Sequence, residues 1–145
     1  MENILANNLI HSFKISFNRY IDDNLFFYED NVEITNNNQL KKINFFLMGS
    51  KNDILLNLEY RFEYFVYFRI KSSCRNIYIR FDSFLTFKGY EKDNLLSLNQ
   101  IEGNDIPEKF KNYCDYVVRI LETDLKDVVE GKEWIDMPTD WMGYK

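Results

Sequence analysis

The fold follows from the stretch Ile54-Leu-Leu-Asn-Leu-Glu-Tyr-Arg-Phe-Glu-Tyr-Phe-Val-Tyr-Phe-Arg-Ile70. Every second residue in it is apolar or aromatic, and the positions between them are polar from Asn57 to Glu63. An alternation with a period of two is typical of a β-strand that buries one of its faces. Further along, Phe65 and Tyr67 make the intervening positions aromatic as well. The first half is therefore predicted to bury one face, and the second half to be covered on both.

This stretch is longer than the usual strand of about 5 to 6 residues. It is compatible with one long bent strand, with a strand that contains a bulge, or with a strand whose second half pairs with different neighbours. In each case we expect a helix on one face of the second half and the C-terminal tail on the other.

Other extended segments are expected before and after this stretch, at residues 11–19, 25–34, 43–48 and 77–87. In the second of them, Glu29-Asp30-Asn31 interrupts the apolar residues and predicts a bulge or a small turn. In the first, His11 shares its parity with Phe13 and Ile15, so we expect a packed histidine with a hydrogen-bond partner rather than a catalyst. Together the segments predict an antiparallel sheet over about residues 10–87, with its strand order left open.

A long helix is expected to follow the sheet. Asp105 is typical of a helix start, because an aspartate side chain caps free backbone N–H groups. After it, apolar residues recur at steps of three and four as far as Gly131, which is a C-terminal stop signal. The helix is therefore expected over about 106–130, packed on one face of the sheet. Cys114 lies on its apolar stripe and is expected to be a buried thiol rather than a nucleophile.

These segments predict an α+β fold, with an antiparallel sheet of about five strands and a long C-terminal helix packed on one face. At 145 residues, the chain is expected to form a single domain over residues 1–145. The formal net charge of −5 disfavours a nucleic-acid binder, because such proteins need Lys and Arg to displace counterions. No apolar run approaches the ~20 residues of a membrane helix, and the first residues lack the pattern of a signal peptide. We therefore expect a cytoplasmic protein without a nucleic-acid or membrane partner.

The sequence contains few of the residues that metal and catalytic sites require. Cys74 and Cys114 are the only cysteines and His11 is the only histidine, so the usual Cys/His zinc sites lack ligands and a Ser-His-Asp triad could only be built on His11. No glycine-rich phosphate loop, HExxH, GxSxG or EF-hand pattern is present. Glu59 and Glu63 alternate with an arginine, which is typical of a solvated row of charge pairs on a sheet rather than of an acid–base pair. We expect neither an enzyme nor a cofactor or metal site.

The C-terminal tail, residues 132–145, is rich in aromatic residues and contains both tryptophans of the chain, Trp134 and Trp141. A disordered tail is usually poor in aromatic residues, so this one is expected to be docked. Either the tryptophans close one end of the core, or the tail presents anchors to a partner, since Trp and Tyr are frequent energetic centres of interfaces. The residues concerned in the second case are Asp136, Asp140, Trp141, Met142 and Tyr144.

The ending Glu133-Trp-Ile-Asp-Met-Pro-Thr-Asp-Trp-Met-Gly-Tyr144 resembles the endings of small bacterial immunity proteins, which neutralise toxins of contact-dependent or polymorphic secretion systems. The wider profile is similar to theirs as well, with one small acidic domain, a composition of the kind that AT-rich genomes encode, and no catalytic pattern. The resemblance implies tight binding to one toxin domain, often a basic nuclease, at or beside its active site. It also implies that Glu and Asp match the basic residues of the toxin, with aromatic residues as anchors.

The function expected from the sequence is therefore that of a binding protein, specifically an immunity protein that acts as a monomer or homodimer on a basic toxin. Two alternatives stay open, a homo-oligomeric structural or adaptor protein and a small-molecule-binding domain with a pocket between sheet and helix. If Phe65 and Tyr67 lie on an exposed face, the partner surface is expected there. The partner-binding residues are expected to be Glu59, Glu63, Phe65, Tyr67, Asp136, Asp140, Trp141 and Tyr144.

Overall fold

The computed structural model of the chain describes residues 3–23, 25–72, 77–90 and 97–135. The strands are β1 (Phe27–Ile34), β2 (Leu40–Met48), β3 (Asn52–Tyr60), β4 (Tyr64–Ser72) and β5 (Tyr78–Arg80). The helices are α1 (Ile4–Ser16), α2 (Asn18–Asp22), α3 (Phe81–Phe87), the 3-10 turn η2 (Leu98–Gln100), α4 (Ile106–Glu122) and α5 (Lys126–Val129).

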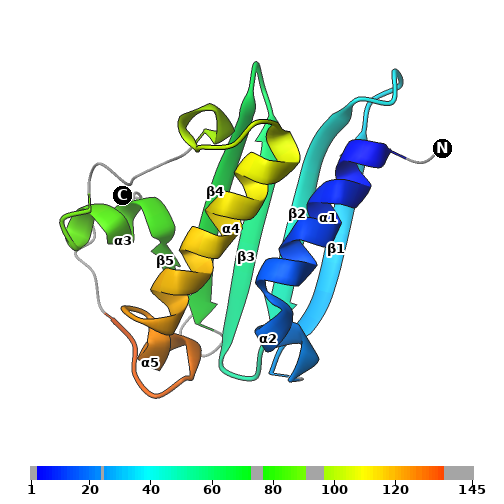
Figure 1. Cartoon of the computed structure of the whole chain (residues 1–145). Coiled ribbons are helices and arrows are strands. Elements are labelled where there is room, and N and C mark those ends of the chain that lie inside the picture. Colours follow the sequence, from blue (N-terminus) through cyan, green and yellow to red (C-terminus); the bar gives the residue numbers. More distant parts are fainter. Residues whose placement is uncertain (1–2, 24, 73–76, 91–96, 136–145) are drawn as a thin grey trace.

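The strands form a five-stranded antiparallel sheet in the order β1-β2-β3-β4-β5, so each strand pairs with its neighbours in the chain. The helices α1 and α4 lie side by side across one face of this sheet, and α3 lies beside its β5 edge (Figure 1). The predicted α+β class and the predicted number of strands are confirmed.

The stretch 54–70 is a β-hairpin rather than a single strand, because β3 and β4 pair antiparallel with Ile54 opposite Ile70. Only residues 61–63 separate the two strands, so the core-facing positions are even-numbered on both sides of the turn. The apolar alternation therefore continues through the reversal, and these three residues include none of the Gly, Asn or Pro that usually mark one. The prediction of one strand, whether bent, bulged or re-paired, is wrong for this reason.

The N-terminal segment is helical, which corrects the strand predicted at residues 11–19. Its buried residues Leu9, Phe13 and Phe17 recur at steps of four, which is the spacing of one face of a helix. Over so short a segment the same residues also fit a period of two, which explains the wrong prediction. His11 lies on the exposed side of α1, so the expected packed histidine is not present.

Two later elements end before their predicted limits. The strand expected at 77–87 stops after Arg80, and the residues that follow form α3. The helix expected over 106–130 ends at Glu122 and is followed by the separate short helix α5. Helical geometry is lost at the residue after Glu122, whose φ and ψ are −119° and −88°.

The strand β1 pairs with β2 without a break at residues 29–31, so the bulge or turn predicted there is absent. The register shift in this pair lies between Glu33 and Ile34 instead, next to the β1–β2 connection. A shift at the end of a strand leaves the alternation of faces intact along the rest of it.

The helix α4 packs its apolar stripe against the sheet, as predicted. Asp105 caps its first turn by accepting a hydrogen bond from the backbone N–H of Glu108 at 2.9 Å. Cys114 on this stripe is fully buried, and burial raises the pKa of its thiol well above the ordinary value. The thiol is therefore held in its protonated, unreactive form.

The core lies between the helices and the sheet and is dominated by aromatic rings. Phe17, Phe13, Phe45 and Phe110 form a continuous stack that leads from the end of α1 through β2 to α4. The ring centroids are 4.3 Å apart for Phe17 and Phe13, 4.4 Å for Phe13 and Phe45, and 5.5 Å for Phe45 and Phe110. This stack joins both long helices to the sheet.

Candidate functional site

The face of the sheet opposite α1 and α4 carries no helix in the described part of the chain, and we call it the open face (Figure 1). Successive side chains of a strand point to opposite faces. Because Phe45, Leu56 and Val66 are buried in the core, their neighbours in sequence point to the open face. The sheet thus presents a second, solvent-facing surface to which all five strands contribute.

The open face is rich in apolar and aromatic side chains. Phe27 is 68% exposed, and at the β3–β4 turn Phe62 is 76% exposed, with its ring edge-on to that of Phe65 at 5.3 Å. Exposed apolar side chains gathered on one face are typical of an interaction site. The polar row Asn31, Asn44 and Asn57 crosses this face between the Phe46–Leu55 pair and Phe65. The apolar members of the open face and its turn are Phe27, Phe46, Met48, Leu55, Phe62, Phe65, Tyr67 and Tyr78.

One row of cross-strand neighbours crosses the open face from edge to edge. In the sheet register each member lies opposite the next, and the order is Glu29, Phe46, Leu55, Arg69 and Arg80. The row is therefore acidic at the β1 edge, apolar in the centre and basic at the β5 edge.

Further charged residues extend these two borders. Glu33 adds a second carboxylate on β1, and Lys71 of β4 adds a third cation near β5. The guanidinium of Arg69 and the ammonium of Lys71 lie 5.0 and 5.9 Å from the ring centroid of Tyr78. These cation–π contacts hold both cations over the open face. The middle strands add one cation, Lys42, and two carboxylates, Asp53 and Glu59.

Four of the predicted partner residues come together at the β3–β4 end of the open face. Phe65 and Tyr67 are half-buried on β4, Glu59 lies opposite Phe65 on β3, and Glu63 is in the turn. The helix expected on one side of this hairpin half is α4, on the core side. The tail expected on the other side lies outside the described residues beyond Ile135, as do Asp136, Asp140, Trp141 and Tyr144.

The charges around the β3–β4 turn make surface contacts. Arg61 lies 3.9 Å from Glu59, and Glu63 accepts a hydrogen bond from the side-chain amide of Asn99. Such exposed contacts contribute little to stability. Arg61 and Glu63 lie in the turn rather than on a strand, so the row of charge pairs predicted on a sheet face is not formed.

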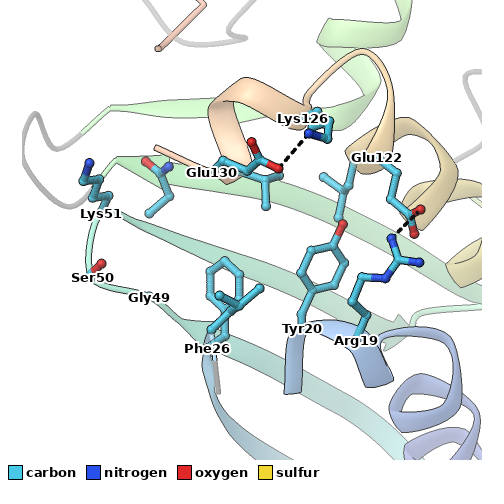
Figure 2. A pocket seen from close by; sticks show the side chains of 13 residues that line it. Arg19, Tyr20, Phe26, Gly49, Ser50, Lys51, Glu122, Lys126 and Glu130 are labelled. Carbon is cyan, nitrogen blue, oxygen red and sulfur yellow. Dashed lines mark hydrogen bonds and ion pairs between the residues drawn. The ribbon is translucent and has the colours of Figure 1, made fainter. Parts of the chain in front are cut away.

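A cavity of about 410 Å³ lies at the other end of the sheet, beside the β2–β3 turn (Figure 2). Its walls come from α2, from this turn and from the junction of α4 with α5, and they include the apolar side chains of Phe26, Leu121 and Val129. Gly49 allows the turn to approach closely, since a Cβ atom there would lie 2.6 Å from the carbonyl oxygen of Asn52. His11 is not among the residues that line this cavity.

Two ion pairs border the cavity. Arg19 Nη1 lies 2.9 Å from Glu122 Oε2 and links α2 to α4, while Lys126 Nζ lies 3.0 Å from Glu130 Oε2 on the opposite wall. Lys132 contacts the other oxygen of Glu130 at 2.9 Å. Hydrogen bonds from these two lysines lower the pKa of the Glu130 carboxyl.

Tyr20 of α2 directs its hydroxyl between these ion pairs (Figure 2). Burial, followed by the nearby carboxylate of Glu122, raises the pKa of this hydroxyl to about 12. The group is therefore a neutral hydrogen-bond donor at physiological pH. It makes no hydrogen bond to another described residue, so its proton is available to a molecule in the cavity.

No protein-family model and no solved structure matches this chain. The chain is 32% identical over 154 residues to a protein of Dictyostelium discoideum described as "Probable polyketide synthase 33", an alignment that covers 92% of the chain. It covers 5% of that protein, so the chain spans only a small part of the relative's length. None of the helices in the described residues is both long and apolar enough to span a bilayer.

Sequence reasoning missed the cavity because its walls meet only in the folded chain. Arg19 and Glu122 are 103 positions apart, and Lys51 contacts Gly131 from 80 positions away. The turn at Gly49 was the one part with a local signal, since glycine followed by Ser and Lys predicts a reversal. Nothing local indicates that helix ends close over this turn.

Proposed function

We propose that this chain is a binding protein that engages another protein through the open face, and that this partner is a toxin which it neutralises in the cytoplasm. The observation that carries the proposal is the open face itself. A solvated face of an antiparallel sheet is ordinarily polar, whereas this one has an apolar, aromatic centre between charged borders.

The composition of the open face supports a protein partner. The buried centre of a protein interface is enriched in aromatic residues and Met, and its rim is polar. Phe46 and Leu55 supply such a centre, and the strongly exposed rings of Phe27 and Phe62 offer anchors that a partner's pockets can bury.

The β1 edge supports contact through the face rather than the addition of a strand. Glu29, Asp30 and Glu33 place charges along this free edge, and such charges discourage pairing with another strand. Asp30 accepts a hydrogen bond of 2.6 Å from the hydroxyl of Tyr28, which fixes its carboxylate at the edge.

The acidic border and the net charge of −5 support a basic toxin as the partner. Complementary charge speeds the encounter of two proteins and fixes their orientation. Glu29 and Glu33 lie on the same strand and the same face, with Glu29 opposite the apolar Phe46 and Glu33 opposite Lys42.

Reversing this border is expected to weaken toxin binding. With the toxin domain encoded next to this chain as the partner, the double variant Glu29→Lys/Glu33→Lys should lower the association rate constant at least about tenfold, measured by surface plasmon resonance at low salt. The matched control Asp22→Lys/Asp23→Lys makes the same change in net charge at the exposed end of α2 and should bind like the native protein.

Two results would contradict the proposal. One is a neighbouring gene that encodes no secreted protein with a toxic C-terminal domain. The other is a toxic neighbour against which co-expression of this chain gives no protection.

A second candidate function, a homodimer, is favoured by the row from Glu29 to Arg80. Rotation by 180° about an axis parallel to the strands stacks two open faces with β1 of one copy over β5 of the other. Glu29 then faces Arg80 of the second copy, and Leu55 meets its own equivalent at the axis. An axis across the strands would instead place acid over acid, so the charges select one arrangement.

The homodimer is tested without any toxin. Light scattering after size-exclusion chromatography should give twice the monomer mass for the native chain, and the monomer mass for Glu29→Arg, because this change places like charges together. The control Asp23→Arg should remain dimeric. A native chain that is monomeric at about 100 μM would exclude the dimer and leave the toxin as the proposed occupant of the open face.

A further inference from the structure

We infer that the cavity beside the β2–β3 turn binds a small organic carboxylate with an apolar body. The cavity lies on the helix side of the sheet, away from the open face, so this site is independent of the proposed protein partner. Its volume of about 410 Å³ falls within the range of about 300–1,000 Å³ that is typical of small-molecule sites.

The negative charge of the ligand follows from Lys51. The other cationic side chains that line the cavity, Arg19 and Lys126, each have a carboxylate partner. Lys51 has no carboxylate within 4.0 Å in the described part of the chain, and its ammonium contacts only the backbone carbonyl of Gly131, at 3.5 Å. The lining thus holds three cations against two carboxylates, which leaves one positive charge for a monoanion.

The position of Lys51 is fixed by packing as well. A Cβ atom on Gly131 would lie 2.3 Å from Lys51 Cδ, so the lysine stem lies against the glycine backbone. Gly131 adopts a φ of +74°, a left-handed conformation that glycine enters without strain. This contact fixes the lysine stem beside the cavity, and the side chain is exposed at the rim.

The apolar body of the ligand follows from the walls. Phe26, Leu121 and Val129 line the cavity with apolar surface, and a small inorganic anion would leave this surface unfilled. Tyr20 provides the free hydroxyl donor described above, which can hydrogen-bond to a second oxygen of the ligand (Figure 2). The cavity thus favours an amphipathic carboxylate, because it combines one net positive charge, one free hydroxyl donor and an apolar wall.

The test uses 4-phenylbutyrate as the probe, with ¹H–¹⁵N spectra of the whole chain to locate binding. We expect a Kd on the order of 1 mM or tighter, with shifts at residues 49–52 and 126–130. Lys51→Met, which keeps the stem and removes the charge, should weaken binding about tenfold, and Tyr20→Phe about threefold or more. The matched control Lys42→Met removes a charge from the open face and should leave the Kd unchanged.

Two comparison compounds test separately whether the cavity requires the negative charge and the apolar body of the ligand. The neutral 4-phenyl-1-butanol should bind at least about tenfold more weakly, and inorganic phosphate should produce no shifts in the cavity. The inference would be overturned if the alcohol bound as tightly as the carboxylate, or if phosphate saturated the cavity. It would also be overturned if the shifts were confined to the open face, or if Lys51→Met left the Kd unchanged. Val129→Trp fills the cavity and should abolish the shifts, and a variant that still bound would overturn it as well.

Discussion

Replacing Phe45 by alanine is expected to lower the free energy of unfolding by about 3–5 kcal/mol, which is the usual cost of removing a buried phenylalanine ring. Phe45 is 1% exposed and lies in the middle of the aromatic stack, between Phe13 on α1 and Phe110 on α4. The variant therefore leaves a cavity at a point where both long helices contact the sheet. Urea denaturation followed by far-UV circular dichroism measures the change.

The control for Phe45→Ala is Phe62→Ala, which removes the same ring from a position that is 76% exposed. Its effect should stay within about 0.5 kcal/mol, because exposed substitutions away from special features seldom do more. If the two variants lost similar amounts of unfolding free energy, the aromatic stack would not be a main source of the stability of the core. Both variants should keep the slope of the denaturation curve if unfolding remains two-state.

The second large effect is expected from a buried carboxylate in β4, and it is tested with two single variants at adjacent positions of this strand. Val66→Glu places an ionisable group at a site that is 0% exposed, where an unpaired charge costs several kcal/mol, and it should abolish the near-UV circular dichroism of the folded chain. Tyr67→Glu points to the open face and should leave the fold intact, with a stability change of about 1 kcal/mol or less.

This pair of variants also tests the open face directly. If Tyr67→Glu unfolded the chain as completely as Val66→Glu, the face would have to be covered, and the proposed protein contact there would fail. If Tyr67→Glu remains folded, the same variant should lose binding of the toxin domain, because it puts a charge beside the apolar centre. Stability and binding are thus separated by a shift of one position along a strand.

The class of the fold was predictable because period-two and helical patterns are strong in the middle and at the end of the chain. The sheet position of residues 43–48 and the apolar stripe of α4 follow directly from such patterns. The hairpin at residues 61–63 was not predictable in this way, since an odd-numbered turn preserves the parity of the flanking strands. Whether a position is odd or even indicates which face of the sheet its side chain occupies, but it does not indicate where the chain reverses direction.

The prediction of a strand at residues 11–19, where the structure has a helix, was wrong for a related reason. Phe13 and Phe17 are separated by four positions, a distance that both a strand and a helix place on one face. Leu9 extends the series by another step of four, which both periods allow, whereas the buried Ala6, at a step of three, fits only the helix. A longer window would have favoured the helix, since Ile15 is then left on the exposed side, where the structure has it.

The two candidate sites also differ in how far they could be predicted from the sequence. Phe65 and Tyr67 were predicted as partner residues for the case that they lie on an exposed face, and the structure places them half-buried on the open face. The cavity depends on contacts between distant segments, such as Arg19 with Glu122, which no local pattern encodes. Surface properties of a sheet can thus be predicted from its strands, whereas an enclosed site requires the tertiary structure.

The order in which the elements leave the ribosome has a consequence for the newly made chain. Domains generally fold as units during synthesis, and the helix that closes this core, α4, is made after the whole sheet. Until α4 emerges, the core face of the meander lacks its largest helical cover, and residues such as Leu56 and Val66 stay partly in water. The nascent sheet is then apolar on both sides at once, a state that invites aggregation. Pauses in translation before residue 106 should therefore lower the yield of soluble protein, whereas pauses after residue 122 should not.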